Sequence, residues 1–208
     1  MHSWYSNQAN PPQDAHATIF VAEVASTVNE LLFAHRKLRE SQNEQEKLFI
    51  LNELMETYKG TLFRQTMFAE FEREMHAAKA RGEALTADFI SRNYYALNQK
   101  YFGDGVLCDE EIAYEWERIP HFYNCFYVYK YATCISAASL IVRRIEEEGD
   151  AYVGKYLDFL RCGSAKSPLD SLLVAEIDMT KPAVIESAIR DFADTVAAFR
   201  TLYQKEKN

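Results

Sequence analysis

The sequence predicts an all-α protein, folded as a multi-helix bundle. Apolar residues recur at steps of three and four through most of the 208 residues, which is the spacing of amphipathic helices. Only 7 residues are glycine and 5 are proline, which disfavours a turn-rich β architecture and favours long helices. No segment shows the alternation of a strand. We therefore expect residues 1–208 to form a single helical domain, or a large part of one.

The first half of the chain is expected to form three helices. Helical spacing of apolar residues predicts the first helix over about residues 14–40. Ser41 is placed to cap a second, much longer helix over about 44–80, which Gly60 can bend. A third helix is expected over about 86–101, capped by the threonine at its start and stopped by the glycines that follow it.

The second half begins with a short acidic helix, followed by a strongly apolar and aromatic helix that Gly149 closes. Ser167 and Pro168 have the form of an N-cap residue followed by proline at the first helical position. The expected helices of this half cover about 109–117, 122–148 and 150–160, one begins at 168, and the last runs from about 182 to the C-terminus.

Charge and cysteine usage restrict the partners and the compartment. The net charge of −8 argues against a nucleic-acid partner, because phosphate binding requires a basic surface. No apolar run approaches the length of a transmembrane helix, so no membrane partner is expected. The four cysteines show no C-x-x-C pair and no metal-ligand spacing, which is typical of reduced thiols packed as small apolar side chains. We expect a cytoplasmic protein.

One carboxylate stands within an otherwise apolar helical run, IFVAEVASTVNELLF. In this run Glu23, Ser26 and Glu30 fall on one helix face. A buried carboxylate without a partner is costly, so Glu23 could bind a metal, act as a general base or pair with a basic side chain. Alternatively, Glu23 reaches the edge of the helix and meets solvent or an arginine.

The histidines form no local zinc motif. A His-Glu-x-x-His sequence would place two imidazoles one helical turn apart and add a carboxylate to activate water, and the chain contains none. Each histidine is therefore expected at the surface or in a satisfied structural position. The five histidines are His2, His16, His35, His76 and His121.

A second candidate region is PHFYNCFYVYKYATC, residues 120–134. On the expected helix, Tyr123, Tyr127 and Tyr131 share one face, and His121 stands at the helix start. Phenol and imidazole groups can donate hydrogen bonds to a developing oxyanion. An equally weighted alternative is an aromatic core helix whose hydroxyls find ordinary partners.

Several separated segments together resemble one family of peptidases. These segments are FVAEVASTVNE, RIPHFYNCFYVYKYAT and SAKSPLDSLLVAEIDMTKPAVIE, and the opening MHSWYSN also fits. They are similar to the C-terminal part of oligoendopeptidase F, in the thimet-oligopeptidase-like group of zinc metallopeptidases. The resemblance covers essentially the whole chain in the right order. It implies the C-terminal portion of a larger helical peptidase domain, which cleaves short peptides inside a deep channel.

The resemblance also implies roles for single residues. In this family zinc is held by the two histidines of the motif and by a glutamate that matches Glu23, with Glu30 behind it as a carboxylate that orients the ligands. Tyr129 matches the tyrosine that stabilises the oxyanion, and His121 is expected to assist it. The residues expected to contact the peptide substrate are Tyr123, Tyr127 and His2.

The chain departs from the family in lacking the His-Glu-x-x-His motif, which should lie immediately before Met1. We therefore expect a fragment that is inactive alone and does not bind zinc tightly. Its expected partners are short peptides and the missing N-terminal half, or further copies of the chain through an exposed apolar face of the first helix. Two alternatives are a helical module that binds peptides without cleaving them, and one half of a split peptidase.

Overall fold

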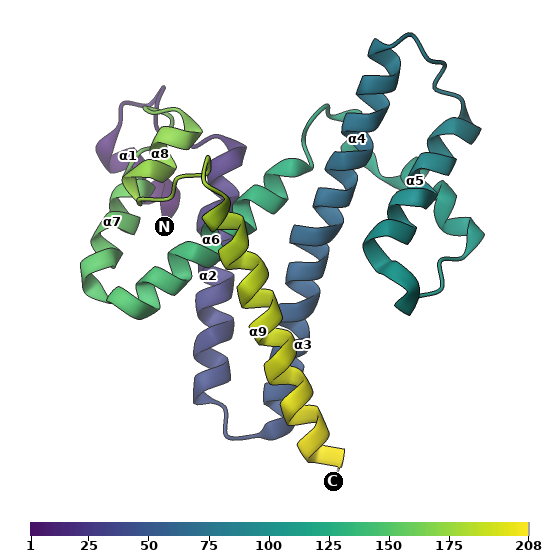
Figure 1. Ribbon diagram of the computed structural model, residues 1–208. Helices are drawn as coiled ribbons and strands as arrows, with labels where there is room; N and C mark the ends of the chain where they lie inside the picture. Colours follow the sequence, from purple (N-terminus) through teal and green to yellow (C-terminus); the bar gives the residue numbers. More distant parts are fainter. Residues whose placement is uncertain (208) are drawn as a thin grey trace. The chain divides into compact units, whose positions relative to one another are not determined.

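The computed structural model describes residues 1–207, and it describes their side chains as far as Lys205. Every regular element within 1–207 is helical and none is a strand, which confirms the predicted all-α class. The chain separates into two compact units (Figure 1). Unit 1 comprises Met1–Lys59 and Thr133–Asn208, and unit 2 comprises Gly60–Ala132. That the 208 residues make up one incomplete domain stays a prediction.

Unit 1 is an assembly of packed helices. Within it α3 lies along α9, α1 packs on α7, and α2 contacts both α3 and α8 (Figure 1). Its core is aliphatic with a few buried tyrosines, among them Tyr58 and Tyr152. The helices are α1 (His2–Ala9), α2 (Ile19–Glu40), α3 (Glu44–Tyr58), α6 (Tyr129–Glu148, which starts in unit 2), α7 (Asp150–Arg161), α8 (Pro168–Val174) and α9 (Pro182–Lys207).

Helix α1 was not predicted, because its residues are mostly polar and show no apolar stripe. Tertiary contacts hold it in place. Ser6 Oγ donates a hydrogen bond to the carbonyl of Ala15 at 2.6 Å, and Asn10 Nδ2 donates to the carbonyl of Arg161 at 2.6 Å. Contacts distant in sequence therefore supply what the local pattern lacks.

The predicted cap of α3 was wrong by two residues. Asn43, not Ser41, is the N-cap residue, and its Oδ1 accepts hydrogen bonds from the backbone N–H groups of Gln45 and Glu46. The Ser41 hydroxyl instead donates to the side chain of Glu46 at 2.6 Å. The helix begins after Asn43 because the side chain that reaches its first N–H groups decides where it starts.

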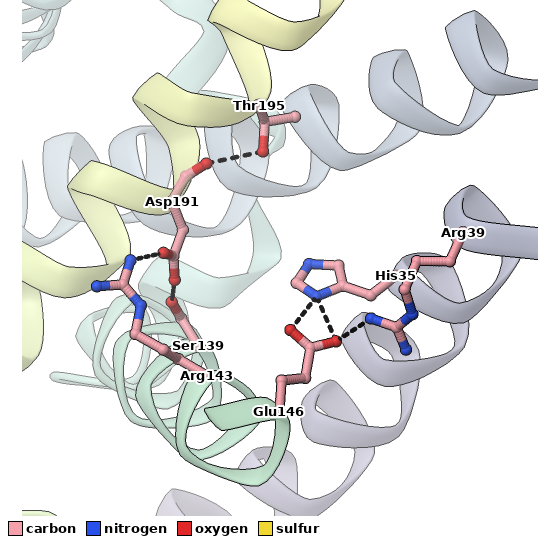
Figure 2. Close-up of polar contacts among 7 residues, drawn as sticks. All are labelled: His35, Arg39, Ser139, Arg143, Glu146, Asp191 and Thr195. Carbon is pink, nitrogen blue, oxygen red and sulfur yellow. Dashed lines mark hydrogen bonds and ion pairs between the residues drawn. The ribbon is translucent and has the colours of Figure 1, made fainter. Parts of the chain in front are cut away.

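A polar network joins α6 to α9 inside unit 1 (Figure 2). The Asp191 carboxylate of α9 accepts hydrogen bonds from Ser139 and Arg143 of α6, and Thr195 Oγ1 donates to the Asp191 backbone carbonyl at 2.7 Å. Burial raises the pKa of Tyr58, close to this network, to about 12. The network satisfies charged groups that would otherwise be desolvated between helices.

A separate group of polar contacts joins α6 to α2 (Figure 2). Arg39 Nη1 donates to the Glu146 carboxylate at 2.5 Å, and His35 Nδ1 lies 3.2 Å from both of its oxygens. Glu146 is the first of three consecutive glutamates, a run that in the sequence has the character of a solvated surface. Glu146 corrects that interpretation, because it pairs with two side chains of α2.

Unit 2 is built on α4 (Arg64–Ala80) and α5 (Ala87–Phe102), which pack against each other. The predicted long helix over 44–80 is confirmed in its extent. It is interrupted by a π-helical turn, η1 (Lys59–Phe63), which includes Gly60, the residue at which a bend was expected. Thr86 caps α5 as predicted, since its Oγ1 accepts the N–H of Phe89 at 3.2 Å. The buried apolar core of the unit contains Met67, Phe68, Phe71, Tyr94, Leu97, Ile119 and Val128.

The C-terminal part of unit 2 differs from the prediction. The acidic segment forms 3-10 turns, η3 (Glu110–Arg118), after the short η2 (Gly103–Gly105). The aromatic helix expected over 122–148 begins only at Tyr129, and it is preceded by the 3-10 turn η4 (Pro120–Tyr123). The physical reason lies at Phe126, whose φ of 54° is left-handed and breaks the helical path.

Candidate functional site

The predicted metal ligand lies on α2 in unit 1. Glu23 is half-buried, beside the stripe that α2 turns to the core, and Glu30 is exposed. Among the described side chains, neither carboxylate makes a hydrogen bond or ion pair. In these 208 residues Glu23 thus reaches the edge of its helix, and its oxygens are available to a ligand. The buried stripe consists of Val21, Val24, Ala25, Val28 and Leu31.

The donor set for zinc is incomplete in the described part of the chain. No group of three His, Cys, Asp or Glu side chains there could hold a metal ion. A catalytic zinc takes three protein ligands and keeps one position open. Glu23 fits as one oxygen ligand, and the 208 residues contain no His-Glu-x-x-His to supply the others.

His2 lies at the start of α1 in unit 1. Its ring packs against Phe159 of α7, with ring centroids 5.8 Å apart. Burial and the neighbouring N-terminal ammonium lower the pKa of His2 below 6.5. The imidazole is therefore neutral at pH 7. Its ring contributes to the packing of α1 against α7 through Phe159.

Three rings of unit 2 form a cluster on the segment that leads into α6. The His121 ring lies 5.9 Å from that of Tyr127 and 6.0 Å from that of Tyr131, measured between centroids. The two tyrosine rings meet edge to face at 5.6 Å, with their hydroxyls 3.5 Å apart. The Lys130 ammonium stands over the Tyr127 ring, 5.0 Å from its centroid. The structure thus brings His121 and Tyr127 together.

The other two predicted residues of this segment are exposed. Tyr123 is 84% exposed and touches no described ring or polar side chain. Tyr129, the first residue of α6, is 40% exposed. The expectation that Tyr123 shares one helix face with Tyr127 was wrong, because the residues between them are not α-helical.

Two buried carboxylates of unit 2, Glu72 and Glu115, were not predicted from the sequence. Glu72 is 7% exposed, but its surroundings in the sequence, MFAEFEREM, include three further charged residues, so no local pattern marked it as buried. Glu115 accepts hydrogen bonds from Tyr94 at 2.6 Å and from Arg64 at 2.6 Å, and it pairs with Arg118. Neither carboxylate was expected to belong to the site, yet the two carry most of the buried charge of the unit.

The Glu115 cluster has a defined charge state. Burial acts to raise the pKa of Glu115, but hydrogen bonds from Tyr94 and Arg64 outweigh it and leave the pKa below 4.5. Burial, and then the Glu115 carboxylate, raise the pKa of Tyr94. At neutral pH an ionised carboxylate therefore accepts from a neutral phenol and from a guanidinium.

Two further expectations concern the cysteines and the membrane. All four cysteines are free, but only Cys134 is buried and Cys125 is exposed, so packing as small apolar side chains holds for one of them. Between residues 1 and 207, no helix is both long and apolar enough to cross a membrane.

The fold places the chain in the class of helical peptidases. It superposes on a crystal structure of oligoendopeptidase-F from Enterococcus faecium with a TM-score of 0.88 and 37% sequence identity, covering 98% of this chain and 37% of that one. Residues 1–191 match the model of peptidase family M3, and the chain belongs to this family.

Curated relatives agree with this assignment. The chain is 46% identical over 207 residues to the oligopeptidase PepF of Bacillus subtilis, matching 100% of this chain and 31% of the relative. It is 38% identical over 205 residues to the chromosomal oligoendopeptidase F of Lactococcus lactis subsp. cremoris, matching 99% and 34%. The chain therefore spans about a third of the length of these relatives, and the predicted resemblance to this group is confirmed.

Proposed function

We propose that these 208 residues supply the C-terminal part of the active site of a zinc-dependent metalloendopeptidase that hydrolyses short oligopeptides. The observation that carries the proposal is the family match over residues 1–191. The exposed phenol and imidazole groups of residues 121–131 support it, because they are hydrogen-bond donors of the kind that peptide hydrolysis uses. The proposed compartment is the cytoplasm, which the four free thiols support.

In this proposal Glu23 is one zinc ligand, and the remaining ligands and the general base come from polypeptide outside the 208 residues. Zinc in such a site polarises the peptide carbonyl and lowers the pKa of water. Glu23 is suited to this position because its half-buried carboxylate makes no competing ion pair in the described chain. Glu30, seven residues further along α2, orients the ligand set from behind.

The aromatic segment is assigned to the peptide substrate. The hydroxyl of Tyr129 and the ring N–H of His121 donate hydrogen bonds to the oxygen that becomes negative during hydrolysis. The exposed Tyr123 and the half-buried Tyr127 bind the peptide beside them, since a tyrosine offers both apolar area and a polar tip. His2, neutral at pH 7, is assigned to the substrate side on the resemblance alone.

A chimera tests this assignment. The 208 residues replace the matching segment of the Bacillus subtilis relative, and an internally quenched oligopeptide is the substrate. The chimera is expected to hydrolyse it, and the 208-residue chain alone is not. Glu23→Ala should abolish both zinc binding and hydrolysis, with Glu53→Ala as an exposed control on α3. Tyr129→Phe should lower kcat roughly 100-fold or more while zinc stays bound.

The outcomes separate the alternatives. Chelator-sensitive hydrolysis by the 208-residue chain alone would contradict the incomplete zinc site. An active chimera that tolerates Glu23→Ala would contradict the ligand assignment. An inactive chimera, together with peptide binding by the chain measured by calorimetry, would favour a peptide-binding module. Activity restored by adding the rest of the relative as a separate chain would favour a split peptidase.

A further inference from the structure

The backbone of unit 2 turns left-handed at Phe126, between the His121 ring and the start of α6. The φ of 54° at this residue is unfavourable for a side chain with a Cβ. Glycine would adopt it without strain. A phenylalanine in this conformation persists only when neighbouring groups hold it there.

A buried carboxylate supplies that restraint. The backbone N–H of Phe126 donates a hydrogen bond of 2.5 Å to Oε1 of Glu72, a residue of α4 that is only 7% exposed. The ring of Phe126 also stacks on His76 of α4, one helical turn further on, with centroids 4.5 Å apart. No other described group hydrogen-bonds the Glu72 carboxylate, so this amide is the polar partner that its burial requires.

Two apolar anchors flank the turn. Phe122 lies 5.3 Å from Phe68 and 5.1 Å from Phe71, between ring centroids, and Val128 belongs to the buried core of unit 2. The backbone of residues 123–127 must therefore leave the core after Phe122 and return to it at Val128, within only five residues. The left-handed turn at Phe126 is what returns the chain to the core in time for α6 to begin at Tyr129.

We propose that Glu72 is a positioning residue for the His121–Tyr131 segment, acting through its hydrogen bond to the Phe126 amide. By holding the turn, the carboxylate sets where α6 begins and brings the rings of His121 and Tyr127 together. The consequence for peptide hydrolysis rests on the function proposed above. The structural part does not, because it concerns only the order of this segment.

The first test measures amide hydrogen exchange by NMR in the 208-residue chain. Glu72→Met fills the same space without an acceptor, and Glu72→Gln keeps one acceptor oxygen as the matched control. In E72M the Phe126 amide should exchange roughly tenfold faster, as expected for a lost charge-assisted hydrogen bond. In E72Q it should stay nearer to the wild-type rate. Equal rates for the Phe126 amide in wild type and E72M would overturn the proposal.

The second test separates positioning from simple packing. Phe126→Gly and Phe126→Ala both remove the ring, but only glycine accepts the left-handed φ without strain. Combined with E72M, F126G should restore contacts between the His121 and Tyr127 rings, detected as nuclear Overhauser effects, and F126A should not. If E72M fails to fold, the single variants decide, because F126G should then unfold at higher temperature than F126A. Equal behaviour of the two would contradict a held turn.

The third test uses the chimera. E72M should lower kcat roughly tenfold with zinc content and KM little changed, and E72M combined with F126G should recover part of the loss. Unchanged kcat in E72M would overturn the catalytic consequence. If the chimera without substitutions is inactive, the proposed function fails, whereas the amide-exchange result still decides the role of Glu72 in ordering the segment.

Discussion

The two compact units use their paired charges differently. In unit 1 the charged groups pair between regular helices, as Asp191 of α9 does with Arg143 of α6 and Glu146 of α6 with Arg39 of α2 (Figure 2). In unit 2 the buried carboxylates belong to segments that are not α-helical or bind to them. Glu72 accepts a hydrogen bond from the backbone N–H of Phe126, and Glu115 lies within η3. One unit uses charge to join helices, and the other uses it to shape irregular backbone.

This difference bears on where function is expected. Paired charges between helices leave few polar groups available to a ligand. Irregular backbone that is fixed by buried groups can expose side chains to solvent. Tyr123, the last residue of η4, is exposed in this way. The same contrast explains why the polar network of unit 1 is assigned to stability and the aromatic segment of unit 2 to substrate.

The largest expected effect on stability is in unit 1. Asp191→Asn removes the counter-charge of Arg143 and should lower the free energy of unfolding by roughly 2 to 3 kcal/mol. Asp194→Asn, exposed and one turn further along α9, is the matched control and should change little. Urea unfolding followed by circular dichroism measures both. Equal midpoints would show that the α6–α9 pair does not stabilise the unit.

In unit 2, Tyr94→Phe should cost about 1 to 2 kcal/mol, because it deletes the phenol that donates to the buried Glu115 carboxylate. Tyr114→Phe, 59% exposed, is the control. Amide exchange should become faster in α5 and η3 for Y94F, while α2 and α9 keep their protection. Uniform loss of protection throughout the chain would contradict a local role of this hydrogen bond in α5 and η3.

A smaller, pH-dependent effect is expected at Glu146. Burial acts to raise the pKa of this carboxyl, but hydrogen bonds from Arg39 and His35 outweigh it and lower the pKa below 4.5. The stabilisation is therefore present above the unfolded-state pKa and is lost as the pH falls through the folded-state pKa.

Glu146→Gln should accordingly be less stable than wild type at pH 7 by at most about 1 kcal/mol, since the pair is partly exposed. The difference should vanish in acid, below the folded-state pKa. Urea midpoints at a series of pH values measure it. A difference that persists unchanged at the lowest pH would rule out the ionised carboxylate as its origin.

The smallest effect is expected at Tyr123. Tyr123→Phe should change the free energy of unfolding by less than about 0.5 kcal/mol, because the side chain is 84% exposed and its hydroxyl has no described partner. Comparison of Y123F with Y94F distinguishes an exposed tyrosine from a buried tyrosine that stabilises unit 2. A loss comparable to that of Y94F would assign Tyr123 a structural role.

Much of the fold follows from local pattern. The spacing of apolar residues placed α5, α7 and α9 within a few residues of their ends, the Ser167–Pro168 signature placed the start of α8, and an irregularity of the long helix was expected at Gly60, which lies in η1. The segment from 109 to 128 was not, because its 3-10 turns and the left-handed Phe126 depend on contacts with α4 and α5. Helix α1 was missed for a related reason, since only its contacts with distant residues hold it.

The candidate site divides in the same way. The exposed aromatic side chains and the histidine could be singled out from the sequence, and the family resemblance attached roles to them. The contact between the His121 and Tyr127 rings could not be derived from helical spacing, because the helix that the spacing assumed does not exist there. Glu72 was missed because it stands in the charged stretch EFERE, and a sequence does not show which of several neighbouring carboxylates is buried.

The sequence by itself determined the all-α class, the order of the helices and the family, because amphipathic spacing, capping residues and separated motifs are local properties of the chain. Only the tertiary structure decided that Glu72 rather than Glu23 is buried, that Glu146 is paired, and that α6 begins at Tyr129. Burial and hydrogen-bond partners depend on segments distant in the chain that meet only when it folds, so no local pattern contains them.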